Sequence, residues 1–175
     1  GYLRSAALVG RQEELLQVRA AVQSASRGEG SALLFEGPLG EGKSRLLREA
    51  SLEAQLAGMA VVLAPSDGDA RAPYGVLREI VRGLVRLFPA EIPTIARERA
   101  PIVGRVLPEV LAANAAEAVP LAPLEGDPRQ DRLQLQAALV GLFHDVAARH
   151  PLAILVDDVQ RADEGSAAVL ASLAH

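Results

Sequence analysis

The chain has 175 residues, of which 50% are hydrophobic and 23% are charged, and its formal net charge is -4. This apolar content excludes a disordered chain, and the absence of cysteine excludes disulfides and thiolate metal sites. No apolar run approaches the roughly 18 residues of a membrane span, and the acidic balance argues against a nucleic-acid surface. We therefore expect a cytoplasmic domain that binds neither membranes nor nucleic acids.

The first third of the chain alternates between helical and strand-like patterns. Apolar residues at helical spacing predict a helix over Gln12–Ser26, and glycines follow it. Ser31–Phe35 is a short apolar run bounded by glycines, which is typical of a buried strand. A second helix is predicted over Ser44–Ala57 and a second buried strand over Met59–Leu63. This order of elements is that of the βαβ unit of a parallel sheet.

The middle of the chain is predicted to be helical. Val76–Phe88 is strongly amphipathic, with its apolar residues on one stripe. Val119–Gly126 holds two prolines and is predicted to be a loop, and Asp127 is placed to cap a long helix that ends at about Arg149. Between these regions, four prolines limit the chain to short helices: Pro89, Pro93, Pro101 and Pro108.

The sharpest motif is Gly37–Ser44, which fits the phosphate-loop pattern G-x-x-x-x-G-K-[ST]. Its glycines let backbone N–H groups approach phosphate oxygens, and the next helix points its positive N-terminus at the same anion. Lys43, the one lysine among 18 basic residues, would reach the β- and γ-phosphates, and Ser44 would offer its hydroxyl to Mg²⁺. Two alternatives stay open: a glycine-rich turn with the pattern by chance, and a degenerate loop that binds without hydrolysis.

A second constellation follows the predicted third strand, Leu152–Val156. Asp157 and Asp158 would lie at the carboxyl edge of a parallel sheet, which is also where the phosphate loop would lie. Asp157 would hold Mg²⁺ opposite Ser44, and Asp158 would orient or deprotonate the attacking water. Alone, such acids are more often turn formers or helix caps. Asp163 is predicted to cap a last helix.

Together these motifs resemble a known family, the ATPase module of large bacterial signalling regulators, the signal-transduction ATPases with numerous domains. Such modules occur in LuxR-type transcription regulators and in fusions with adenylate cyclases or protein kinases. The resemblance rests on four segments of this chain, Leu8–Leu15, Phe35–Leu47, Pro73–Gly75 and Asp157–Asp163. It implies an α/β fold, the P-loop NTPase three-layer sandwich with a mostly parallel sheet and a helical insertion over about 75–150.

The resemblance also implies ATP and Mg²⁺ as ligands and an ATP-driven switch in a signalling or transcription regulator. Lys43 and Asp158 would then be catalytic, and Ser44 and Asp157 would bind the metal. Partners would be other domains of the parent regulator, with nucleotide-dependent self-association. The residues expected to bind the nucleotide, with the first three near the adenine, are Val9, Gly10, Arg11, Gly37, Pro38, Leu39, Gly40, Glu41, Gly42, Lys43, Ser44 and Arg45.

Three departures from the family pattern are visible. Arg161 replaces a usual tryptophan, and Glu41 puts an acid inside the phosphate loop, where we expect it to point to solvent. The family's fourth strand, which inserts between the first and third, its fifth strand and its helical lid have no counterpart here. We therefore expect residues 1–175 to be the N-terminal part of one ATPase domain, truncated at its C-terminus, with a gap at the centre of its sheet.

Two other functions remain as alternatives. A small-molecule phosphotransferase on the same fold would need an acceptor pocket and a lid, and the chain shows no acceptor-binding signature. A non-catalytic interaction scaffold would keep the fold and dock partners through its helical middle.

Overall fold

The computed structural model describes residues 10–64, 73–108 and 128–174. It is a mixed α/β structure with a small parallel sheet of two strands, consistent with a partial P-loop NTPase fold. The described elements, in chain order, are α1 (Gln12–Ser26), α2 (Lys43–Leu56), β1 (Ala60–Ala64), α3 (Gly75–Leu87), α4 (Glu91–Ala96), α5 (Ala100–Val103), α7 (Pro128–Ala147), β2 (Leu152–Val156), the 3-10 turn η1 (Val159–Arg161) and α8 (Glu164–Leu173).

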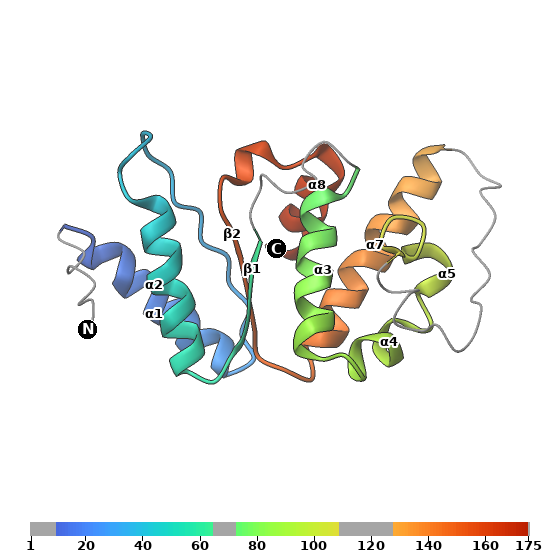
Figure 1. Ribbon diagram of the computed structural model, residues 1–175, viewed down its shortest axis with the longest axis horizontal. Coiled ribbons are helices and arrows are strands. Elements are labelled where there is room, and N and C mark those ends of the chain that lie inside the picture. The colour runs from blue at the N-terminus through green and yellow to red at the C-terminus, as the bar shows by residue number, and fades with distance from the viewer. Residues whose placement is uncertain (1–9, 65–72, 109–127, 175) are drawn as a thin grey trace.

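The two strands are parallel and in register, with Ala60 opposite Leu152 and Ala64 opposite Val156. Figure 1 shows helices on both sides of them: α1 and α2 on one side, and α3, α7 and α8 on the other. Both strands are continuously apolar because helices cover both faces of the sheet. The predicted third strand matches β2, and the predicted second strand is shifted by one residue along β1.

The main core lies between the sheet and α3. Val62 and Ala64 of β1 are buried against this side, together with residues of α4, α5, α7 and α8. The amphipathic stripe predicted for the α3 region is confirmed, because its central residues are fully buried. These are Leu77, Ile80, Val81 and Leu84. The proline-rich stretch that follows α3 forms two short helices, α4 and α5, as expected.

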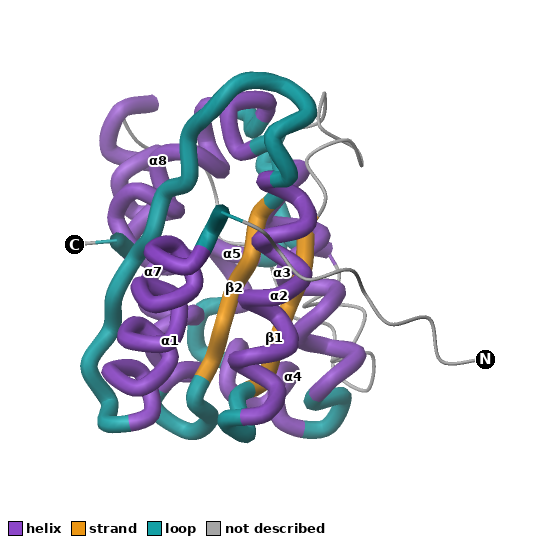
Figure 2. Tube along the Cα trace, turned by 90° about the vertical axis from the view of Figure 1, so that its left-hand side faces the viewer, coloured by secondary structure: helices purple, strands orange, loops and turns teal. Residues whose placement is uncertain are grey.

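The predicted strand at Ser31–Phe35 is wrong. Residues 31–38 form no strand, and Leu33 and Leu34 are 43% and 67% exposed. In Figure 2 this segment runs on the side of β2 away from β1 without pairing to it. An extended segment becomes a strand only when a neighbour takes up its N–H and C=O groups. The described strands pair only with each other, and no further strand is present in the described residues to bridge the segment to β2.

Most of the remaining helices agree with their predicted bounds. α1 begins and ends where the periodicity placed it, and α8 begins directly after Asp163. The long helix predicted to end near Arg149 is α7, which ends at Ala147. The expected loop at Val119–Gly126 and the expected cap at Asp127 lie outside the described residues.

Candidate functional site

The phosphate-loop motif leads directly into helix α2. Gly40 and Gly42 have φ angles of 87° and 80°, and Gly42 is the residue that precedes the first helical residue, Lys43. A Cβ on either glycine would meet no atom within 4 Å, so it is the left-handed backbone, not crowding, that calls for glycine here. No side chain caps the first turn of α2, so its N–H groups face the loop without a side-chain acceptor. This arrangement suits an anion.

The side chain of Lys43 folds back into the loop. Its Nζ donates hydrogen bonds to the carbonyl oxygens of Gly37 and Pro38, both at 2.8 Å. The ammonium therefore lies beside the loop backbone, where a point charge can meet phosphate oxygens. Ser44 is exposed on the first turn of α2. Arg45 follows it, and its Nη2 atom is buried without a hydrogen-bond partner.

The opening segment reaches the phosphate loop through Arg11. This guanidinium donates to the backbone oxygen of Glu41 at 2.9 Å and to the Glu41 carboxylate at 3.5 Å. The Glu41 side chain is 47% exposed, in line with the expectation that it points to solvent, and its carboxylate also contacts Arg11. Gly10 has a φ of 85° beside this contact, and Val9 lies outside the described residues. The opening segment thus contacts the phosphate loop at Arg11, and the expected position near the adenine stays a prediction.

The paired acids follow β2 at the same end of the molecule as the phosphate loop. Both views show the loop and the end of β2 at the top (Figures 1 and 2). The backbone N–H of Asp157 donates to the Ala64 carbonyl at 3.3 Å, which extends the sheet contact by one residue. The Asp157 carboxylate accepts from the N–H of Asp158 at 3.0 Å, and Asp158 has a left-handed φ of 48°. Among the described residues, no hydrogen bond or ion pair joins either acid to Lys43 or Ser44.

A magnesium ion would depend on the nucleotide for much of its coordination. Within the described parts of the chain, no three His, Asp or Glu side chains converge in a way that could hold a metal. Magnesium in nucleotide sites is commonly held by one or two protein oxygens together with phosphate oxygens and waters. The Ser44 hydroxyl and the Asp157 carboxylate are oxygen donors of that kind. The donor chemistry of these two residues therefore suits a metal that arrives with a triphosphate.

One contact that the sequence did not predict joins two of the segments on which the resemblance rests, Pro73–Gly75 and Asp157–Asp163. Asp163 caps α8 by accepting from the N–H of Ser166 at 3.0 Å, as predicted. The same carboxylate accepts from the N–H groups of Tyr74 and Gly75, at 2.9 and 3.0 Å, where α3 begins. The two segments are separated by 88 residues or more, so no local pattern could show the contact.

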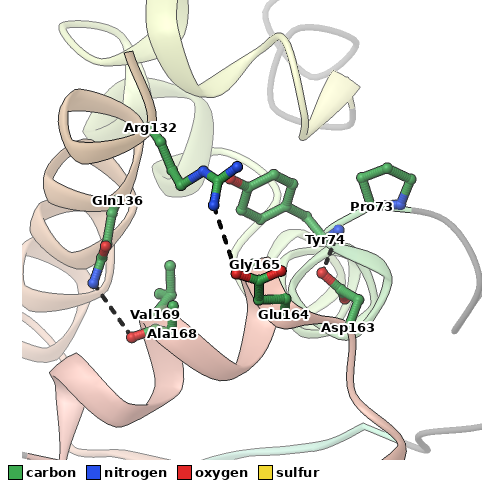
Figure 3. A pocket seen from close by; sticks show the side chains of 9 residues that line it. All are labelled: Pro73, Tyr74, Arg132, Gln136, Asp163, Glu164, Gly165, Ala168 and Val169. Atoms are coloured by element: carbon green, nitrogen blue, oxygen red, sulfur yellow. Dashed lines mark hydrogen bonds and ion pairs between the residues drawn. The ribbon is translucent and has the colours of Figure 1, made fainter. Parts of the chain in front are cut away.

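This link forms one wall of a pocket of about 340 Å³, shown in Figure 3. The Tyr74 ring lies over Gly165, where a Cβ would approach Cε1 of that ring to 2.7 Å. Burial raises the pKa of the Tyr74 hydroxyl. Although burial alone would raise the pKa of Asp163, the hydrogen bonds from Ser166, Tyr74 and Gly75 outweigh it and lower that pKa. At the rim of the pocket, the exposed side chains of Arg132 and Glu164 form an ion pair with an N–O distance of 3.5 Å.

The family comparison agrees with these landmarks. The AAA ATPase domain family matches residues 7–175, which is all but the first six residues. Searches of curated proteins and of solved structures find no match. Among the described helices, none combines the length and the hydropathy that a membrane crossing requires. With a glycine-shaped phosphate loop and a match over nearly its whole length, the chain belongs to the AAA ATPase domain family.

Proposed function

We propose that this chain binds ATP with Mg²⁺ and hydrolyses it, and that the nucleotide state works as a switch in a bacterial signalling or transcription regulator. Membership of the AAA ATPase domain family implies ATP binding. The observation that carries the proposal is the phosphate loop: two left-handed glycines lead into an uncapped helix, and the Lys43 ammonium lies against the loop carbonyls. Hydrolysis, the regulator context and self-association rest on the paired acids and on the resemblance.

Each site residue has a defined task in this proposal. The loop backbone and Lys43 would hold the β- and γ-phosphates, and binding would move the ammonium from the loop carbonyls to phosphate oxygens. Ser44 and Asp157 would hold Mg²⁺, which supplies neutralising charge to the phosphates when it is bound. Asp158, exposed at the end of β2, would orient or deprotonate the attacking water. That residues 1–175 are the front part of a single ATPase domain stays a prediction.

Calorimetric titration of the purified chain with MgATP tests the proposal. The wild-type chain is expected to bind, and Lys43→Ala is expected to weaken binding at least about tenfold, because a charge-assisted contact to the phosphates is lost. Arg48→Ala is a matched control, since it removes one positive charge from an exposed position on the same helix. It should bind like the wild type.

A wild-type chain that gives no heat with MgATP and no thermal shift would reject ATP binding and favour the non-catalytic scaffold. Equal losses for Lys43→Ala and Arg48→Ala would show that general charge, and not the loop lysine, governs binding.

A further inference from the structure

The Arg11 side chain joins the start of α1 to the phosphate loop, 30 residues away. One nitrogen of its guanidinium donates to the Glu14 carboxylate at 2.6 Å, and the other donates to the backbone oxygen and the carboxylate of Glu41. The pKa of Arg11 is raised, first by the hydrogen bond to Glu14 and further by the charges of Glu14 and Glu41. The guanidinium is therefore oriented by one acid while it contacts the other.

Glu41 is an unfavourable residue for a loop that binds phosphate. A Cβ placed on Gly37 would lie 2.7 Å from Glu41 Oε2, so the carboxylate lies against the first glycine of the loop. The carbonyl oxygen of the same glycine accepts a hydrogen bond from the Lys43 ammonium. The acid and the lysine thus lie around one residue, and an unpaired carboxylate there would repel a polyanion over a short distance.

We propose that Arg11 clamps Glu41 and offsets part of its charge, although Arg11 also pairs with Glu14, so that the loop can accept a triphosphate in spite of its own acid. In this role Arg11 is a positioning residue: it acts on the phosphates through Glu41 and not through a contact with the nucleotide. The inference rests on the proposed function, because it presumes that the loop binds a triphosphate.

The chain supplies its own control for such a clamp. Arg19 of α1 donates two hydrogen bonds to the Glu53 carboxylate of α2, at 2.7 and 2.9 Å. This arginine–carboxylate pair joins α1 to α2, whereas Arg11 directly precedes α1 and Glu41 lies in the loop before α2. Glu53 lies near the far end of α2 from the loop. If the clamp merely held α1 against α2, breaking either pair would affect binding alike.

The experiment measures the affinity of the whole chain for MgATP and for inorganic triphosphate in a double-mutant cycle. The variants are Arg11→Gln, Glu41→Gln, the double variant, and Arg19→Gln as the control. Arg11→Gln should weaken both ligands about fivefold, because it leaves the Glu41 carboxylate, which is 47% exposed, without its ion-pair partner. Glu41→Gln should bind at least as tightly as the wild type. The double variant should bind within about twofold of Glu41→Gln, and Arg19→Gln like the wild type.

Recovery of affinity in the double variant supports the clamp, and it also shows that Arg11→Gln had not simply unfolded the chain. The same loss for Arg11→Gln with and without Glu41 would overturn the clamp, as would no loss at all. A loss seen with MgATP but not with inorganic triphosphate would mean that Arg11 contacts the nucleoside, and it too would overturn the clamp. If the wild-type chain binds neither ligand, the proposed function itself fails, and that outcome is distinct from the others.

Discussion

At the scale of single residues, Asp163 shows how one carboxylate can serve two helices. Its oxygens accept from the backbone at the start of α8 and at the start of α3, and Ser166 Oγ adds a bond at 2.6 Å. A helix start has N–H groups without partners inside the helix, and an ionised acceptor satisfies them best. The two helices are therefore fixed relative to each other by one side chain that follows the end of β2.

Replacing Asp163 should destabilise the fold. Asp163→Ala removes the cap and leaves several N–H groups without an acceptor, for a loss of about 2–4 kcal/mol in the free energy of unfolding. The neighbouring Glu164→Gln removes the same charge from a side chain that is 92% exposed, and should cost far less. Chemical denaturation followed by circular dichroism measures both variants. Equal stability of the two would contradict the role of Asp163.

The contribution of Asp163 should also depend on pH. Its pKa in the folded chain is lowered from the usual 3.8, so the folded state favours the ionised form. The stabilisation is then fully present above the pKa of the unfolded chain and is lost as the pH falls through the lower, folded pKa. The difference in stability between the wild type and Asp163→Ala should be constant above about pH 5 and shrink below about pH 4. A constant difference down to pH 2 would argue against the assignment.

The proposed role of Asp158 makes a kinetic prediction. Asp158→Asn keeps the size and the hydrogen-bonding ability of the side chain but removes its basicity, so MgATP binding should be kept while hydrolysis slows by about 100-fold or more. Asparagine also tolerates the left-handed φ of this position. Phosphate release at saturating MgATP measures the effect. Equal turnover by both proteins would reject Asp158 as the residue that activates water.

At the scale of elements, α3 and β1 pack closely against each other at a glycine of α3. Gly83 is buried, and a Cβ there would come within 2.6 Å of Val62 Cγ1 and 3.3 Å of Cγ2. Val62 is 3% exposed, and its branched side chain has little freedom to turn away. The close approach of the helix to the sheet therefore depends on a residue that lowers helix propensity.

Gly83→Ala should consequently destabilise the chain even though alanine is the better helix former. Overpacking of a core costs about 1–3 kcal/mol, whereas the gain in helix propensity is about 1 kcal/mol. Val62→Ala makes room for the added methyl group, so the double variant should lose less stability than the sum of the two single variants. Denaturant titration of all four proteins gives this coupling. Strict additivity would show that α3 can move away from β1 without cost.

At the scale of the whole molecule, the phosphate loop is not held by a sheet. Residues 31–36 lead into it, and among the described residues no hydrogen bond between backbone groups holds them. In contrast, α3 is covered by the sheet on one side and by other helices on the other. The well-packed half of the molecule is thus the side of the sheet that carries α3, α7 and α8. The loop depends on α2 and on the Arg11 contact for its position.

Hydrogen exchange should reveal this uneven stability. Amides of residues 31–36 are expected to exchange within seconds, at rates close to those of an unfolded chain, while amides of Ile80–Leu84 should be among the slowest. Mass spectrometry of peptides from a timed exchange measures both segments in one sample. Strong protection of residues 31–36 would show that the segment finds a backbone partner in solution.

The sequence alone determined what depends on neighbouring residues: the period of α1 and α3, the apolar runs of β1 and β2, the start of α8 at its cap Asp163, and the phosphate-loop pattern with its lone lysine. These features are local, so residue type and spacing are enough to predict them. The tertiary structure decided the rest. Ser31–Phe35 has the composition of a strand but no partner, and the contacts Arg11–Glu41 and Asp163–Tyr74 join segments 30 and 89 residues apart. Such contacts depend on how the chain folds back on itself, which no local pattern records.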